Sequence, residues 1–395
     1  MKKKVSHLFT FLAIGLAMLS LPAGATTLNT VPEGLLSLDI PATSGVSVFF
    51  SLPLTADPVY TGAVAASGVT ATTITVADAT PPFANLTTGV QLANLAAAGH
   101  PYFVKFLSGA ETGRVLRIAS NTSSALTLDT TDNTSQTTSL LTSGFAVAAG
   151  DTFEVFPGTT LATVFGDGSA QDPVAIAPYT GVSVLAADTV GIPDSTGHIN
   201  AYFYNQPNSR WEAFGNSQNL NNTIIYPYSA LSITRRSNTN ALSIVPMAKV
   251  STVLTSGAAA TDQLVPMSRV AEVGIRTKTT GSSHVVFGST SYPVDMTLSQ
   301  VTFSTGAVWA TYQPTNPVAP QVASPLLADT VSVWNTTSHR FDTFYQNADH
   351  TWTQFGVTGD KSAFLIPAGR AIQILHRSAI NGANSFLPST MPYSL

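Results

Sequence analysis

The sequence predicts an all-β protein, in which a small β-barrel or β-sandwich domain is followed by two related β modules. Short segments rich in β-branched and aromatic residues, bounded by Gly, Pro, Asn or Ser, follow one another along most of the chain, whereas helical periodicity is poor. The second half also repeats its own motifs at a fixed spacing. With 395 residues and 44% apolar side chains, the chain can form more than one core and is too apolar for intrinsic disorder.

Residues 1–25 have the pattern of a removable secretory signal peptide. Three lysines follow Met1, an apolar run covers 8–21, and small residues end the segment at Ala25. The apolar run is too short for a comfortable bilayer span, although a membrane-anchoring helix is the alternative. The sequence therefore predicts export to the cell surface, the extracellular medium or the periplasm, with no integral membrane span after cleavage.

The next part of the chain is expected to hold N-terminal strands over 26–60 and a small β-barrel-like domain over 61–157. Glycine-bounded or polar turns at 108–114 and 121–124 indicate hairpins. The strands expected around these turns are 46–50, 73–76, 102–106, 114–118, 125–128 and 152–156. Residues 90–98, ahead of Gly99, fit a short helix. The domain is expected to be an insertion into a sheet that resumes near Thr160.

The rest of the chain contains a duplication. Residues 187–190 recur at 328–331, 203–205 at 344–346, and 211–215 at 352–356, all with the same offset of 141 residues. We therefore expect one β module at 158–250, a connecting β segment at 251–296 and a second copy of the module at 297–395. Because the spacing has no gap, the two hairpins are expected to superimpose, with Phe203 and Phe344 facing the same layer.

The repeated aromatic residues allow two interpretations. In the first, they are the core of each module, because large aromatic side chains dominate core energetics. The residues concerned are Phe203, Trp211 and Phe214, with Phe344, Trp352 and Phe355. In the second, they are exposed platforms for sugar rings, with Asn205, Asn208 or Asn347 supplying hydrogen bonds. The candidate ligand-binding residues are then Tyr202, Tyr204, Trp211, Tyr345 and Trp352.

The repeated charged residues are expected to be structural. Asp188 and Asp329 are equivalent in the repeat and should serve the same turn twice. Arg235, Arg236 and Arg377 lie near strand ends, where they are expected to be solvated edge charges that discourage aggregation. Binding of an acidic group by these arginines is the alternative.

Composition argues against several classes of function. Without the three leader lysines the chain has 14 basic and 21 acidic residues, which disfavours nucleic-acid binding. The chain has no Cys, so disulfides, thiol nucleophiles and zinc–thiolate sites are excluded. No spacing of His, Ser or acidic residues matches a catalytic motif, and the Asp167 and Asp172 pair lacks the spacing of an EF-hand. We therefore expect no enzymatic activity, cofactor or metal.

Several motifs resemble a known family. They are Ser108-Gly109, Gly113-Arg114, Ile118, Leu126-Thr127-Leu128, Gly150-Asp151, the segment 160–166, the segment 187–190, Tyr202-Phe203-Tyr204, Trp211 and Arg235-Arg236. Together they are similar to an uncharacterised family of exported bacterial proteins that occurs as large paralogous sets in single genomes. The likeness covers residues 31–250, and 297–395 then resemble a second, atypical copy of the last module. The resemblance implies export and an all-β, surface-type role, and it identifies no site.

The expected function is that of a non-catalytic exported protein, structural or adhesive, at the cell surface or in an extracellular matrix. Its expected partners are further copies of itself, in a self-assembling layer, or surface glycans. Low charge, repeated β modules and the export signal favour this class. The alternative is a carbohydrate-binding protein that uses the repeated aromatic hairpins. The two differ in whether the repeated aromatic rings are buried or exposed.

The leader pattern generates a first prediction. Signal peptidase should cleave after Ala25, because small residues end the segment there behind the apolar run. N-terminal sequencing of the exported protein should start at Thr26. Mature protein that retains Lys2, Lys3 and Lys4 would contradict the prediction.

Overall fold

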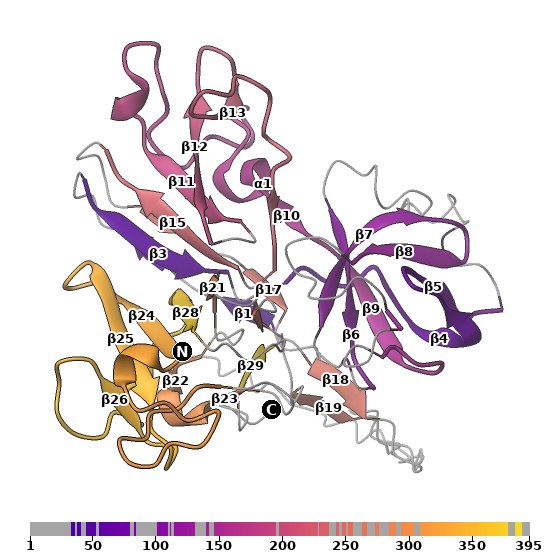
Figure 1. Cartoon of the computed structure of the whole chain (residues 1–395). Helices are drawn as coiled ribbons and strands as arrows, with labels where there is room; N and C mark the ends of the chain where they lie inside the picture. The colour runs from indigo at the N-terminus through magenta and orange to yellow at the C-terminus, as the bar shows by residue number, and fades with distance from the viewer. Residues whose placement is uncertain are drawn as a thin grey trace, which may run out of the picture.

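Figure 1 shows the fold of the chain as a computed structural model. The structure describes residues 33–35, 38–40, 45–52, 55–79, 83, 101–109, 111, 114–130, 140–141, 146–194, 197–227, 229–236, 242–244, 247–249, 252–255, 263–266, 273–275, 284–289, 294–303, 309–377 and 384–388. The expected leader at 1–25 and the expected helix at 90–98 lie outside these residues. Within them the chain is nearly all β, which confirms the predicted fold class.

Six of the described strands form a closed β-barrel. These are β4 (Tyr60–Val69), β5 (Thr73–Val76), β6 (Tyr102–Phe106), β7 (Val115–Asn121), β8 (Ala125–Asp129) and β9 (Thr152–Pro157), closed in the order β4-β5-β8-β7-β6-β9. The predicted turns at 108–114 and 121–124 join the β6–β7 and β7–β8 hairpins. Alternate residues point inward and fill the barrel, and they include Val104, Phe106, Leu116 and Phe153.

The barrel also packs against the rest of the chain through its outer surface. Phe103 and Phe156 point away from the barrel core and pack with Met296 and, more peripherally, Tyr226. The rings of Phe103 and Tyr226 meet edge to face at 5.7 Å. This outer cluster attaches the barrel to both β modules.

The first module is a five-stranded antiparallel sheet. Its strands are β3 (Ser47–Ser51), β11 (Thr189–Pro193), β12 (Ile199–Asn205), β13 (Arg210–Ala213) and β15 (Ala230–Thr234), in the order β13-β12-β11-β15-β3. Strand β3 precedes the barrel in the chain but pairs with β15, which follows it. The barrel is therefore inserted into this sheet, as the sequence predicts, and the N-terminal strand β3 belongs to the first module.

The second module is a sheet of the same topology. Its strands are β21 (His284–Gly288), β24 (Thr330–Asn335), β25 (Arg340–Gln346), β26 (Trp352–Gln354) and β28 (Ile372–His376), in the order β21-β28-β24-β25-β26. Read from the opposite end, this order matches the first sheet strand by strand. Strand β21 lies in the segment expected only to connect the modules, and it occupies the place that β3 has in the first sheet.

Short elements complete each module. The helical ones are α1 (Leu161–Phe165), η2 (Val184–Ala186), η3 (Leu298–Gln300) and η4 (Pro325–Leu327). The two-residue pairs are β10 (Thr159–Thr160) with β14 (Ile224–Ile225), and β22 (Met296–Thr297) with β27 (Leu365–Ile366). The remaining strands are β1 (Glu33–Leu35), β2 (Leu38–Ile40), β16 (Leu242–Ile244), β17 (Met247–Lys249), β18 (Thr252–Thr255), β19 (Gln263–Pro266), β20 (Val273–Ile275), β23 (Val301–Phe303) and β29 (Asn384–Pro388). Among the described residues, no helix combines the length and apolar character that a bilayer crossing requires.

The two sheets meet at an aromatic cluster. Phe49 of β3 lies 4.9 Å from Trp334 and 5.2 Å from Phe341, measured between ring centroids. Phe287 of β21 stacks on Phe49 at 6.0 Å. The Ser51 amide also donates a hydrogen bond of 2.9 Å to the Gly369 carbonyl. The edge strand of the first sheet is therefore covered by the second sheet (Figure 1), which protects an otherwise open edge.

A buried aspartate holds three segments together in each module. The Asp188 carboxylate accepts hydrogen bonds from the amides of Ala177 and Arg236, and lies 2.9 Å from Arg235 Nε. Asp329 accepts from the amides of Ala310 and Arg377 in the same way. The expectation that Asp188 and Asp329 serve the same structural purpose is confirmed.

The expectation of solvated edge charges is wrong for Arg235. This side chain is only 3% exposed and pairs with the fully buried Asp188. A buried guanidinium needs an anionic partner, because desolvating an unpaired charge costs several kcal/mol. The acidic group that Arg235 binds is therefore part of its own module.

The two sheets differ in the register of one strand. In the first sheet Tyr202 lies opposite Val190, and in the second Phe344 lies opposite Val331. The two valines are 141 residues apart, but Tyr202 and Phe344 are 142 apart. The pairing with the next strand shows the same difference. Trp211 of β13 lies opposite Tyr204, whereas Trp352 of β26 lies opposite Gln346. Strand β25 is thus displaced by one residue relative to both neighbours.

Compensating turn lengths explain why the sequence offset hides this displacement. The turn closed by Pro193 and Ile199 contains five residues, and the equivalent turn closed by Trp334 and Phe341 contains six. The next turn, closed by Asn205 and Arg210, contains four residues, but the one closed by Asn347 and Thr351 contains three. The expectation that Phe203 and Phe344 face the same layer is therefore wrong, since a one-residue shift reverses every side chain.

The inserted barrel generates a second prediction. Tyr60 lies opposite Val155 on neighbouring antiparallel strands, so the two ends of the barrel leave it side by side. Replacing 58–157 by a short Gly-Ser linker should leave a protein that still unfolds cooperatively, because antiparallel neighbours are only about 5 Å apart and the linker adds little loop entropy.

The measurement is urea unfolding followed by tryptophan fluorescence. Loss of the contacts that Phe103 and Phe156 make with Met296 should lower the midpoint without removing the transition. The barrel expressed alone is the matched control, and its unfolding is followed by circular dichroism because residues 58–157 contain no Trp. A deletion variant that unfolds without a cooperative transition would show that the sheet needs the barrel.

Candidate functional site

The predicted ligand-binding aromatic residues do not form one site. Trp211, Tyr204 and Trp352 are buried, and Tyr202 is half-buried. All four point to the inner faces of the sheets, where Trp211 and Tyr204 pack with α1 and Trp352 packs with Phe344. Tyr345 alone of the five lies on the outer face of its sheet.

Trp211 is held in the core by specific contacts. Its indole Nε1 donates a hydrogen bond of 2.8 Å to the Gly166 carbonyl just after α1. Its ring lies 5.9 Å from Phe165 and meets Tyr204 edge to face at 5.8 Å. The Tyr204 hydroxyl in turn donates to the Asp167 carbonyl at 2.9 Å. These rings are structural and present no free face to a ligand.

A different set of aromatic side chains gathers on the outer face of each sheet. In the first sheet Phe203 lies 5.3 Å from Phe214 and 6.1 Å from Tyr179, which it meets edge to face. We call Tyr179, Phe203 and Phe214 the first outer-face trio. Phe203 is buried beneath the other two, whereas Phe214 is 43% exposed. The expectation that Phe214 is a core residue is therefore wrong.

Local backbone structure explains how the trio is assembled. Gly215 has a φ of 76°, which only glycine adopts without strain, and this permits the tight turn that follows β13 and turns Phe214 outward. Tyr179 is attached to the sheet by two backbone hydrogen bonds, one from its amide to the Tyr204 carbonyl and one from the Gln206 amide to its own carbonyl. The trio thus draws on three separate segments of the chain.

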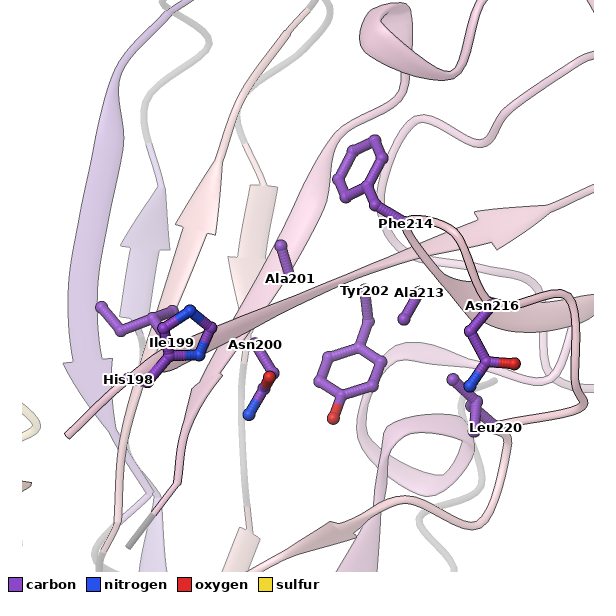
Figure 2. A pocket seen from close by; sticks show the side chains of 9 residues that line it. All are labelled: His198, Ile199, Asn200, Ala201, Tyr202, Ala213, Phe214, Asn216 and Leu220. Atoms are coloured by element: carbon purple, nitrogen blue, oxygen red, sulfur yellow. The ribbon is translucent and has the colours of Figure 1, made fainter. Parts of the chain in front are cut away.

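The first trio forms one wall of a shallow groove of about 290 Å³. The other lining residues are Val184, Asn205, Glu212, Ala213, Gly215, Asn216 and Ser217. A second concave surface of about 460 Å³ shares Phe214 and Asn216 and extends over His198, Asn200 and Tyr202 (Figure 2). In Figure 2, Phe214 and Tyr202 project in opposite directions, and both line this second surface, which adjoins the first groove at Phe214 and Asn216.

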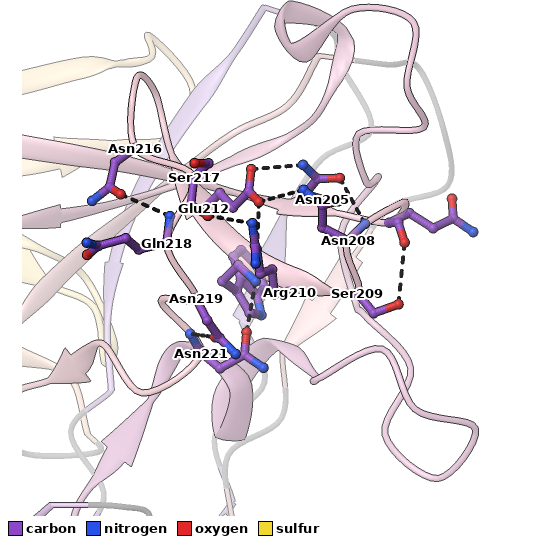
Figure 3. A network of polar contacts seen from close by, with 12 residues as sticks. Asn205, Asn208, Ser209, Arg210, Glu212, Asn216, Ser217, Gln218, Asn219 and Asn221 are labelled. Carbon is purple, nitrogen blue, oxygen red and sulfur yellow. Dashed lines mark hydrogen bonds and ion pairs between the residues drawn. The ribbon is translucent and has the colours of Figure 1, made fainter.

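A polar network closes one end of the first groove (Figure 3). Glu212 accepts hydrogen bonds from Asn205 Nδ2 at 2.8 Å, Asn208 Nδ2 at 2.9 Å and Arg210 Nε at 2.7 Å. Asn205 Oδ1 also accepts from the Asn208 amide at 3.2 Å. The sequence predicts Asn205 and Asn208 as candidate hydrogen-bonding residues. Both lie beside the first outer-face trio.

Glu212 is an ionised acceptor in this setting. Burial acts to raise the pKa of its carboxyl, but hydrogen bonds from Asn205, Asn208 and Arg210, together with the Arg210 charge, outweigh that effect, so the pKa of Glu212 is lowered. A carboxylate has about four acceptor positions, and three donors occupy it here. One position is left for a ligand hydroxyl, while the lowered pKa makes Glu212 a poor proton donor at neutral pH.

The second sheet has an equivalent arrangement. Tyr345 lies 5.0 Å from Phe355 and meets Tyr312 edge to face at 5.6 Å. We call Tyr312, Tyr345 and Phe355 the second outer-face trio. Tyr312 is attached by the same two backbone hydrogen bonds as Tyr179, and Gly356 has the same positive φ as Gly215. The trio is therefore retained although β25 is shifted by one residue.

The polar network beside the first trio also has a counterpart in the second sheet, formed by different side chains. Asn347 occupies the place of Asn205 and donates from Nδ2 to Thr351 Oγ1 at 2.9 Å and to Thr353 Oγ1 at 3.0 Å. Thr353 stands where Glu212 stands in the first sheet. The second site has neutral hydroxyl groups in place of the balanced ion pair.

The described residues contain no group of three or more His, Asp or Glu side chains that could hold a metal ion. In the segment with a faint likeness to a calcium loop, Asp167 accepts a hydrogen bond from the Ser169 amide at 2.8 Å and caps its own turn. The chemistry available at the outer-face trios is that of binding through ring surfaces, amides and hydroxyls.

Sequence reasoning identified the asparagines of these sites but missed most of the aromatic rings. Tyr179 and Tyr312 lie outside the ungapped repeat, and the repeat predicts Phe203, Phe214 and Phe355 as core residues. One signal was available: Tyr202, Phe203 and Tyr204 alternate in direction, so Phe203 cannot share a face with either tyrosine.

Comparisons with protein-family models, curated proteins and solved structures gave no match to this chain.

The contrast between the inner and outer rings generates a third prediction. Trp211→Ala and Trp352→Ala should each lower the free energy of unfolding by about 3–5 kcal/mol, because each removes a large, fully buried side chain. Phe214→Ala, at a half-exposed position, should cost about 1 kcal/mol or less. Urea unfolding of the three variants measures the difference. Equal losses in all three would mean that Phe214 is part of the core.

Proposed function

We propose that this chain is a non-catalytic exported protein with a structural or adhesive role at the cell surface or in an extracellular matrix. In this proposal the two β modules arose by duplication, and each presents one contact surface. Membership of the exported paralogous family belongs to the same proposal, as does cleavage of the leader, which lies outside the described residues.

The observation that supports the proposal is an exposed apolar turn that occurs at the same place in both modules. Leu185 in η2 and Leu326 in η4 are 141 residues apart, and both are more than half exposed. Val182, three residues before Leu185, and Leu327, directly after Leu326, are exposed as well. Apolar side chains gathered at a surface mark contact sites, because their burial against a partner is favourable.

The paired surfaces favour a role in attachment. Each apolar turn precedes the buried aspartate of its module, Asp188 or Asp329, so the turn is held on a rigid element. Two equivalent surfaces on one chain increase avidity for a repetitive partner without any new type of contact. Such a partner is a layer of further copies of the chain or a surface polymer.

The fourth prediction tests this role. Fractionation of the producing cells and medium should find the mature chain in the surface or extracellular fraction, and electron microscopy of the purified protein should find ordered lattices or fibres. The double variant Leu185→Asp, Leu326→Asp should lose assembly or surface retention, since it places a charge on each apolar turn. Leu141→Asp is the matched control, because Leu141 is an exposed apolar residue outside both turns.

Two outcomes would contradict the proposal. One is a chain that stays inside the cell or remains a free monomer in the periplasm. The other is a double variant that assembles and is retained as the wild type is, which would mean that the two turns are not contact surfaces.

A further inference from the structure

The groove beside the first trio combines an exposed ring with hydrogen-bonding groups on one surface. The Phe214 ring forms one side, and Asn205, Glu212, Asn216 and Ser217 provide polar atoms within the same lining. Ligand sites commonly pair an apolar wall with a few convergent polar groups that orient the ligand. At about 290 Å³, close to the lower end of such sites, the groove fits a small cyclic group.

The charge state of the groove favours a neutral ligand. The negative charge of Glu212 is balanced by Arg210, whose Nε lies 2.7 Å from the carboxylate. A phosphate or carboxylate ligand would meet this ionised acceptor, and a cationic ligand would compete with Arg210. A hydroxyl group, by contrast, can donate to the remaining acceptor position of Glu212 and accept from an amide.

The second site narrows the class of ligand. Tyr312, Tyr345 and Phe355 repeat the aromatic wall, and Asn347 repeats Asn205. The acidic group, however, is replaced by Thr353, whose hydroxyl is neutral. What the two sites share is therefore aromatic rings with amide and hydroxyl groups, and a ligand bound by both must offer an apolar face edged with hydroxyls.

From these features we propose that the two outer-face trios bind sugar rings of a neutral, repeating polysaccharide. A pyranose has C–H groups on its faces, which pack against an aromatic ring, and hydroxyl groups around its edge. Phe214 and Phe355 are the stacking residues, and Asn205 with Glu212, or Asn347 with Thr353, are the hydrogen-bonding pairs. A repeating polymer can occupy both sites at once, which raises avidity. The inference rests on the proposed function, since it names the surface polymer.

The test uses the purified mature chain and four polysaccharides in affinity gel electrophoresis. Hydroxyethylcellulose, laminarin and mannan are the neutral probes, and alginate is the anionic control. We expect retention by at least one neutral probe and none by alginate. Phe214→Ala and Phe355→Ala should each weaken retention about tenfold, equivalent to about 1.4 kcal/mol, and the double variant should abolish it. Phe214→Tyr keeps the ring and should bind as the wild type does.

The controls separate binding from folding and from assembly. Leu141→Ala removes an exposed apolar side chain on the barrel and should leave retention unchanged, and unfolding midpoints should show that every variant is folded. No retention by any neutral probe, retention by alginate alone, or a double variant that binds normally would each overturn the inference. A chain that forms lattices at the cell surface but binds no neutral polysaccharide would overturn this inference alone and leave the proposed function intact.

Discussion

Each module is organised around one buried aspartate, Asp188 or Asp329. Asp188 accepts backbone hydrogen bonds from the segment before β11 and from the end of β15, and it neutralises Arg235. Asp329 makes the same backbone contacts in the second module. Hydrogen bonds to a charged acceptor are stronger than neutral ones, and a buried carboxylate without partners would be strongly destabilising. The carboxylate therefore fixes the central strand, its neighbour and the incoming turn relative to one another.

With the central strand fixed, the adjacent hairpin is free to vary. Strand β25 differs from β12 by one residue in register, yet both modules retain a buried Trp on the inner face and an aromatic trio on the outer face. The inner face tolerates the change because Phe344 takes the place of Tyr202, and Gln346 that of Tyr204, opposite the Trp. The outer face tolerates it because Tyr345 takes the place of Phe203. Two different residue sets thus produce one arrangement of rings.

This arrangement relates the architecture to the proposed role. The outer-face trios and the apolar turns lie on the same modules, and Val184 of η2 lines the groove beside the first trio, so the candidate polymer site and the apolar turn of the first module adjoin. The barrel packs through Phe103 and Phe156 against Met296 and Tyr226. The cluster of Phe49, Phe287, Trp334 and Phe341 joins the two sheets. This junction joins the two sheets that carry the candidate sites, so both sites belong to one chain and can contribute to avidity.

The amino-acid sequence was sufficient to predict the all-β class, the strands and turns of the barrel, its insertion into a sheet, and the equivalence of Asp188 with Asp329. These features depend on local signals, such as alternation and glycine-bounded turns, or on identical residues at a fixed spacing. The sequence also predicts Asn205, Asn208 and Asn347 as candidate hydrogen-bonding residues. The folded structure was needed to find which face each aromatic ring occupies, that β3 and β21 complete the sheets, and that Arg235 is buried. The physical reason is that side chains in a strand alternate with a period of two, so one residue added in a turn and one removed in the next leave the sequence spacing unchanged while reversing every side chain between them.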